Sequence, residues 1–89
     1  MMKTVLAVHP ERHVRRLIEV NMEKAGYCVL SAADTEEAMR LVREQKIDMV
    51  MMDWMLTDLQ AALKNNPTTR DVPIVVLEPN KEAKPEDFR

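Results

Sequence analysis

Residues 47–52, IDMVMM, form a nearly unbroken apolar run that ends at an acid, Asp53. A short run of this kind is typical of a central β-strand that is covered on both faces. Residues 4–8 (TVLAV) and 73–77 (PIVVL) have the same character, and residues 27–32 (YCVLSA) are short, apolar and rich in β-formers. The sequence therefore predicts four strands, the third of which carries a carboxylate at its end.

Segments with helical periodicity separate the predicted strands. The first starts at Glu11 and ends at Gly26, the residue type that commonly ends helices. Its apolar residues recur at helical spacing and are expected to face inward: Val14, Leu17, Ile18, Met22 and Ala25. The second starts at Asp34 with an acid three residues later, which predicts a capping box, and the third is the short segment 58–65. Strands and helices that alternate in this way predict an α/β fold with a parallel sheet.

Length and composition limit the classes of protein. With 89 residues the chain has room for one domain, predicted at residues 1–78, and we expect an extended or disordered tail at residues 79–89. A net charge of −2 argues against nucleic acid as a partner. No apolar run approaches the roughly 18 residues of a membrane span. A single cysteine, Cys28, is expected to be buried in a strand and indicates a reducing, cytoplasmic location.

Three segments carry a family resemblance: residues 5–39 (VLAVHPERHVRRLIEVNMEKAGYCVLSAADTEEAM), 47–58 (IDMVMMDWMLTD) and 65–77 (NNPTTRDVPIVVL). Together they resemble the receiver domain of bacterial response regulators. The resemblance implies a three-layer, flavodoxin-like open parallel sheet with strand order 2-1-3-4, without the family's fifth strand and last helix. It also implies a role in two-component phosphorelay signalling, with Asp53 at the position of the phosphoacceptor.

The carboxyl ends of the predicted strands bring His9, Asp53 and Glu78 to one edge of the sheet. Receivers carry two acids after the first strand to hold Mg²⁺, and the matching positions here are His9 and Pro10. Glu78 stands where the family has a small hydroxyl residue. The resemblance therefore implies a degenerate pocket, made of His9, Pro10, Asp53 and Glu78, in which we expect no Mg²⁺ and no other cofactor.

Other metals are not expected either. His9 and His13 are four residues apart, but Pro10 places His9 before the helix. Methionines at 49, 51, 52 and 55 are interpreted as core residues of a strand and its surroundings rather than as copper ligands.

Two functional hypotheses follow. The first is a pseudo-receiver that is not an enzyme and that binds proteins without phosphorylation gating; the alternative is a phospho-accepting receiver that uses Asp53. In the expected strand order the fourth strand lies at an open edge, and exposed edges are usually covered. Ile74, Val75, Val76 and Leu77 are therefore the candidate interface, either with a signalling kinase or effector or with a second copy in a homodimer.

Overall fold

The four apolar runs form a parallel β-sheet in the computed structural model, which describes residues 2–78. The strands are β1 (Thr4–Val8), β2 (Cys28–Ala32), β3 (Met49–Asp53) and β4 (Ile74–Leu77). Their order is β2-β1-β3-β4, so the predicted order 2-1-3-4 is confirmed. Asp53 is the last residue of β3, which places its side chain at the carboxyl end of a central strand.

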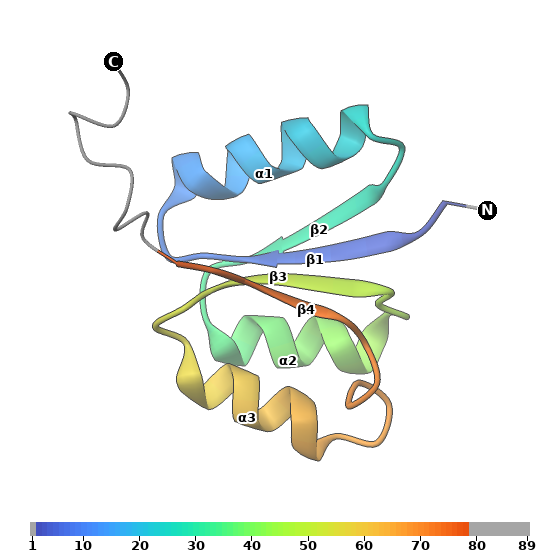
Figure 1. The fold of residues 1–89 in the computed structure, drawn as a ribbon, viewed down its shortest axis with the longest axis vertical. Helices are drawn as coiled ribbons and strands as arrows, with labels where there is room; N and C mark the ends of the chain where they lie inside the picture. The colour runs from blue at the N-terminus through green and yellow to red at the C-terminus, as the bar shows by residue number, and fades with distance from the viewer. Residues whose placement is uncertain (1, 79–89) are drawn as a thin grey trace.

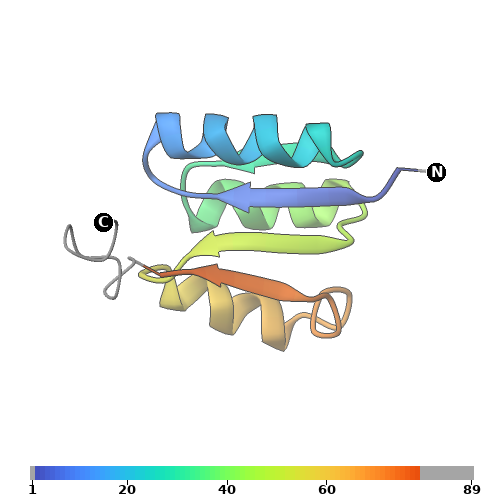
Figure 2. The ribbon, with the colours of Figure 1, turned by 45° about the horizontal axis from the view of Figure 1, so that its top comes forward.

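Three helices cover the sheet: α1 (Arg12–Lys24), α2 (Thr35–Glu44) and α3 (Thr57–Asn65). Figures 1 and 2 show α1 on one side of the sheet and α2 with α3 on the other. The predicted three-layer, flavodoxin-like α/β architecture is therefore confirmed. Within residues 2–78 the fold ends at β4, without a fifth strand or a fourth helix. The predicted tail lies outside the described residues.

The ends of α1 and α2 follow the sequence signals. Gly26 has a φ of 96°, a backbone conformation in which a side chain would be strained. There the Gly26 N–H donates to Glu23 O and the Tyr27 N–H to Met22 O, at 3.0 Å each, which closes α1 with a Schellman motif. At the start of α2, Asp34 Oδ1 accepts from the Glu37 N–H at 2.9 Å, and Glu37 Oε1 accepts from the Ala33 N–H at 2.8 Å.

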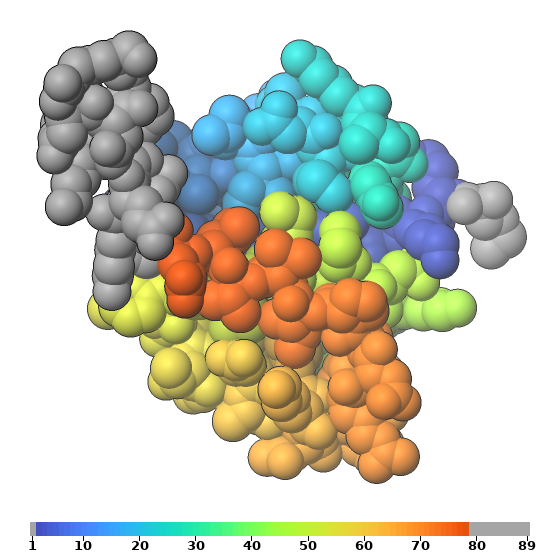
Figure 3. Space-filling view, viewed as in Figure 1, coloured from blue at the N-terminus to red at the C-terminus, as the bar shows by residue number. Residues whose placement is uncertain are grey.

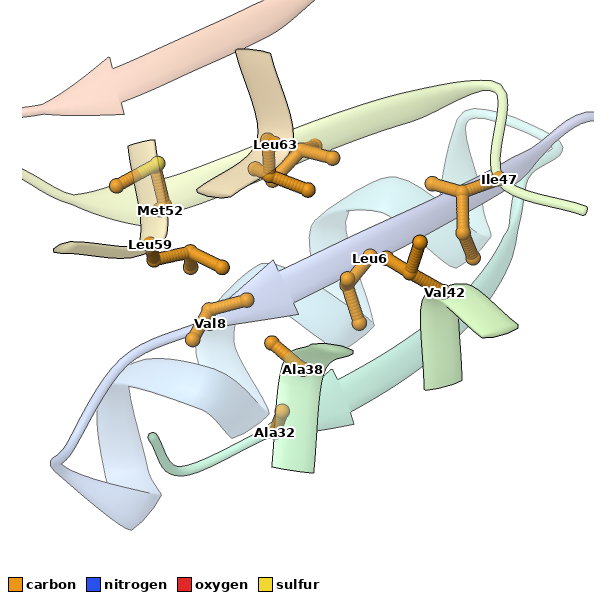
Figure 4. Close-up of a cluster of buried hydrophobic side chains, with 10 residues drawn as sticks. Leu6, Val8, Ala32, Ala38, Val42, Ile47, Met52, Leu59 and Leu63 are labelled. Carbon is orange, nitrogen blue, oxygen red and sulfur yellow. The ribbon is translucent and has the colours of Figure 1, made fainter. Parts of the chain in front are cut away.

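The main hydrophobic core lies between the sheet and the helices α2 and α3. Figure 4 shows side chains of β1 and β3 that meet side chains of both helices. The buried members are Leu6, Val8, Ala32, Ala38, Val42, Ile47, Val50, Met52, Leu59 and Leu63. Side chains alternate along a strand, so Val5 and Ala7, which are also fully buried, face the α1 side.

Four expectations about burial were wrong. Met55 was interpreted as a core residue, but it lies beyond the end of β3 and is 67% exposed. Leu17 is 62% exposed and Ala25 is exposed, although their spacing predicted an inward orientation. α1 packs over β2 and β1. It therefore has a narrow strip of sheet to cover, and Ile18 is its buried residue. Cys28 is exposed rather than buried, because it is the first residue of the edge strand β2.

Candidate functional site

The carboxyl ends of β1, β3 and β4 meet at one edge of the sheet. Asp53 ends β3 and is 8% exposed, and His9 directly follows β1. Asp53 is paired through its Cα with Leu77, the last residue of β4, and Glu78 follows as an exposed residue. The parallel register thus collects His9, Asp53 and Glu78 at the same end of the sheet.

His9 lies against Asp53 in a defined orientation. Its Nε2 is 3.7 Å from Asp53 Oδ1, and both side chains are largely buried. The other ring nitrogen, Nδ1, accepts a hydrogen bond from the Glu11 N–H at 3.0 Å. A nitrogen that accepts carries no proton, so in this geometry the imidazole proton is on Nε2 and faces the carboxylate.

The segment after β1 is held in place by Arg15. Its Nη1 donates to His9 O at 2.7 Å and to Pro10 O at 3.2 Å. The backbone N–H of His9 also donates to Ala32 O at 3.1 Å, which extends the pairing between β1 and β2. Hydrogen bonds therefore hold both the backbone and the ring of His9, so the imidazole has a fixed position in the site.

The residues around Asp53 do not fit Mg²⁺. This cation requires near-octahedral oxygen coordination and is usually held by carboxylates. His9 presents an N–H to Asp53, and Pro10 has no side-chain donor. Glu11 points elsewhere, because its Oε2 lies 3.2 Å from His13 Nε2 at the surface. Among residues 2–78 no three Asp, Glu, His or Cys side chains form a group that would hold a metal ion.

His9 and His13 contact different carboxylates. His9 lies beside Asp53, whereas His13 is exposed beside Glu11. The spacing of four residues therefore does not bring the two imidazoles to a common ligand in this structure.

The segment after Asp53 carries a feature that sequence reasoning missed. Trp54 and Met55 are 42% and 67% exposed, and the Trp54 N–H donates to Leu77 O at 3.1 Å. Two large apolar side chains thus reach the surface beside the site. The signal in the sequence is the pair WM directly after the strand-end acid, where a polar turn is the usual pattern.

A hollow of about 830 Å³ lies at the opposite end of the sheet. Residues 42–48, at the end of α2 and before β3, line it together with residues that precede β4: Asn66, Thr68, Thr69, Asp71, Val72 and Pro73. Because Asp53 is at the carboxyl end of its strand, this hollow is separate from the candidate site. None of the helices in residues 2–78 has the length and apolarity needed to cross a membrane.

Comparisons with known proteins agree with the parallel sheet and with the aspartate at the end of β3. The family model of the response regulator receiver domain matches residues 5–85. The phosphate regulon transcriptional regulatory protein PhoB of Pseudomonas aeruginosa is 38% identical over 80 residues, which cover 84% of this chain and 35% of that protein. The alkaline phosphatase synthesis regulator PhoP of Bacillus subtilis is 37% identical over 59 residues, which are 66% of this chain and 25% of the relative.

Solved structures show the same fold. The chemotaxis response regulator CheY4 of Vibrio cholerae superposes with a TM-score of 0.84 at 26% identity, covering 98% of this chain and 75% of CheY4. TrrA of Thermotoga maritima, solved in complex with Mg²⁺ and BeF, has a TM-score of 0.80 at 22% identity and covers 91% of this chain and 73% of TrrA.

The curated relatives are longer proteins, of which this chain spans about a third or less. The family model covers nearly the whole of this chain, including the sheet and the aspartate at the end of β3. With its fold and with Asp53 at the carboxyl end of β3, the chain belongs to the response regulator receiver domain family of two-component signalling.

Proposed function

We propose that this chain is a pseudo-receiver: a protein-binding module of two-component signalling that works without phosphorylation of Asp53 and is not itself an enzyme. The observation that carries the proposal is the contact between His9 Nε2 and Asp53 Oδ1 at 3.7 Å. The His9 imidazole occupies the space beside Asp53 where a phosphorylated carboxylate would need a cation.

The electrostatics of phosphoryl transfer support this proposal. Transfer to a carboxylate brings two anions together, and a divalent cation normally neutralises the developing charge. The side chains here supply one carboxylate, Asp53, beside an imidazole N–H, with the exposed Glu78 at the same end of the sheet. A single N–H neutralises far less charge than Mg²⁺, and a nearby carboxylate opposes the phosphoryl group.

The alternative is a phospho-accepting receiver that uses Asp53. The position favours it, because Asp53 ends the central strand β3, where the family resemblance places the phosphoacceptor. This alternative needs a cation site made of ligands other than an acid pair after β1.

The partner is proposed to be a protein: a signalling kinase, an effector or a second copy of the chain. The transcriptional role printed for the PhoB relative belongs to a protein about three times longer. A net charge of −2 gives this chain no attraction for nucleic acid. We assign the reducing cytoplasm as its compartment, since Cys28 is its one cysteine and is exposed.

Phosphorylation of the intact chain tests the proposal. The protein is incubated with acetyl phosphate and Mg²⁺ and its intact mass is measured. In parallel, Mg²⁺ is titrated while the fluorescence of Trp54 is recorded; it is the one tryptophan in the chain and follows Asp53 directly. We expect no phosphoryl adduct and no saturable change in fluorescence.

The matched control is Asp53→Asn, which removes the acceptor carboxylate and keeps the side-chain shape. A phosphoryl adduct on the natural chain that is absent from Asp53→Asn would establish the alternative and reject the pseudo-receiver.

A further inference from the structure

A small polar hollow of about 340 Å³ lies between α1 and β2. Five side chains line it, four from α1 and one from β2: Arg12, Arg15, Arg16, Glu19 and Ser31. Figure 3 shows α1, in light blue, at the surface of the molecule. None of the side chains at the candidate site, His9, Asp53 and Glu78, lines this hollow. It is therefore a second concave surface with a chemistry of its own.

Helical spacing and strand register bring these side chains together. Arg12, Arg15 and Arg16 stand at positions i, i+3 and i+4 of α1, which share one face of a helix. Ser31 is paired through its Cα with Ala7, and paired residues of adjacent strands point to the same face of a sheet. Ala7 is buried on the side that carries α1, so Ser31 lies on that side too. The fold thus places three guanidinium groups and a hydroxyl around one hollow.

The hollow carries an excess of positive charge. Three arginines against Glu19 leave a net charge of +2 among its lining residues. Arg16 Nη1 lies 3.3 Å from Glu19 Oε1. Arg12 and Arg15, by contrast, form no ion pair within residues 2–78. The charge of two guanidinium groups is therefore not neutralised by any carboxylate that the structure describes.

Arg15 is fixed in position as well as charged. Its Nη1 donates to His9 O at 2.7 Å and to Pro10 O at 3.2 Å. Both acceptors are neutral carbonyls, so they orient the guanidinium group and leave its charge uncompensated. A cation held in place in this way loses little conformational entropy when it binds an anion.

This arrangement opposes the stability of α1. Like charges at i, i+3 and i, i+4 destabilise a helix. Cations in a first turn also oppose the helix dipole, and the first turn of α1 contains no acidic residue. A local conflict of this kind is typical of a functional site. A bound anion would remove the repulsion between the guanidinium groups.

We propose that this hollow binds the phosphate group of a small molecule, with Arg12, Arg15 and Arg16 as cationic donors and the Ser31 hydroxyl as a further donor. A phosphate monoester carries a charge of about −1.5 to −2 at pH 7 and has three acceptor oxygens. It therefore matches the net charge of +2, which a single carboxylate would only half neutralise. Guanidinium groups bind phosphate through paired N–H donors. The volume is near the lower end of small-molecule sites, which start at about 300 Å³.

Titration followed by NMR of the ¹⁵N-labelled 89-residue chain tests the proposal. Inorganic phosphate and glycerol 2-phosphate are added in separate experiments at constant pH, and sodium chloride keeps the ionic strength constant. We expect saturable shifts of the N–H signals of Arg12, Arg15, Arg16 and Ser31, with half-saturation at about millimolar concentration. Equal affinities would mean that the phosphate group alone is recognised, and tighter binding of glycerol 2-phosphate would mean that the ligand is a monoester. The absence of saturable shifts at these residues with both ligands would overturn the proposal.

Arg12→Gln is the test variant, because glutamine keeps a good helix former without the charge. We expect it to weaken phosphate binding by about tenfold, the loss of one charge-assisted contact. Arg70→Gln is the matched control: Arg70 is exposed, lies outside the hollow and gives the same change in net charge. It is expected to bind phosphate like the natural chain. Equal losses in the two variants would show a general effect of charge and would overturn the proposed site.

Thermal unfolding provides a second measurement that does not depend on signal assignment. Phosphate stabilises many proteins by exclusion from their surface, so the informative quantity is a difference between variants. A bound ligand adds stabilisation that depends on its affinity for the folded state. We expect phosphate, compared with chloride at equal ionic strength, to raise the Tm of the natural chain more than that of Arg12→Gln. An equal rise in both would contradict specific binding.

A peptide of six glutamates distinguishes a phosphate ligand from an acidic protein segment. If it binds more tightly than both phosphate ligands and loses this affinity in Arg12→Gln, the hollow is a protein-binding surface and the proposal is wrong. We expect it to bind more weakly than glycerol 2-phosphate.

The site is independent of the proposed role of Asp53, and the two can fail separately. Asp53→Asn is expected to bind inorganic phosphate with unchanged affinity, because Asp53 does not line the hollow. A covalent phosphoryl adduct at Asp53 would reject only the pseudo-receiver. A loss of the N–H shifts of Arg12 and Ser31 in Asp53→Asn would instead reject the hollow as the binding site.

Discussion

His9 is the side chain that lies against Asp53. The Glu11 N–H donates to His9 Nδ1, which leaves the proton on Nε2, and Nε2 lies 3.7 Å from Asp53 Oδ1. Arg15 fixes the backbone of His9 by donating to its carbonyl oxygen. The imidazole is therefore positioned as a neighbour of Asp53 by two independent anchors. This places a hydrogen-bond donor, rather than an oxygen ligand, beside the Asp53 carboxylate.

The double substitution His9→Asp with Pro10→Asp is expected to create a Mg²⁺ site. It places two carboxylates after β1 in addition to Asp53, and at about 1.5 kcal/mol for each charge-assisted contact the affinity for Mg²⁺ should rise by roughly a hundredfold. Titration of Mg²⁺ against the fluorescence of Trp54 measures the change. The neutral pair His9→Asn with Pro10→Asn is the control, and an equal gain in both variants would show that carboxylate charge is not the cause.

The sequence predicted the position of some single residues and missed others. The sequence indicated that His9 is the neighbour of Asp53, since strand ends meet at one edge, and the distance between them agrees. It did not indicate that Thr69, a polar residue between α3 and β4, is 3% exposed. Its Oγ1 donates to Leu63 O at 2.7 Å near the end of α3. A hydroxyl that satisfies a distant carbonyl leaves no periodic signal in the chain.

At the level of elements, helix termini follow local chemistry. Asp34 accepts from the Glu37 N–H, and Glu37 accepts from the Ala33 N–H. Both side chains therefore satisfy N–H groups that have no partner within a helix. The sequence predicted this start of α2 correctly because the capping interactions span a few residues and depend on little else.

Asp34→Ala is expected to lower the free energy of unfolding by about 1 kcal/mol, because one N–H at the start of α2 loses its acceptor. Denaturant unfolding at a fixed protein concentration measures the loss. Asp34→Asn retains a side-chain oxygen and should remain close to the natural chain. If the alanine variant is equally stable, the cap contributes nothing to the fold.

For the whole molecule, the uneven coverage of the sheet is the main feature. α2 and α3 pack on one side of the sheet and α1 on the other, over β1 and β2 (Figure 1). The main buried core lies on the α2 side, whereas Val75 and Leu17 on the α1 side are exposed.

Leu6→Ala and Leu17→Ala are expected to differ strongly in their effect on stability. Leu6 is fully buried in the core under α2, so its truncation should cost about 2–5 kcal/mol, the transfer term plus a cavity. Leu17 is 62% exposed, and its truncation should cost about 0.5 kcal/mol or less. Denaturant unfolding of both variants at one concentration provides the comparison, and equal losses would contradict the assignment of the core.

By itself, the sequence determined the strands, the helices, their alternation and hence the parallel sheet with Asp53 at its carboxyl edge. These follow from periodicity, caps and strand-end residues, all of which act over a few positions. Only the tertiary structure decided which apolar residues are covered: Leu17 and Cys28 have the pattern of buried residues, but the layers that would bury them do not reach them. It also decided how the His9 ring is turned toward Asp53, because that orientation depends on hydrogen bonds from Glu11 and Arg15 made once α1 is in place.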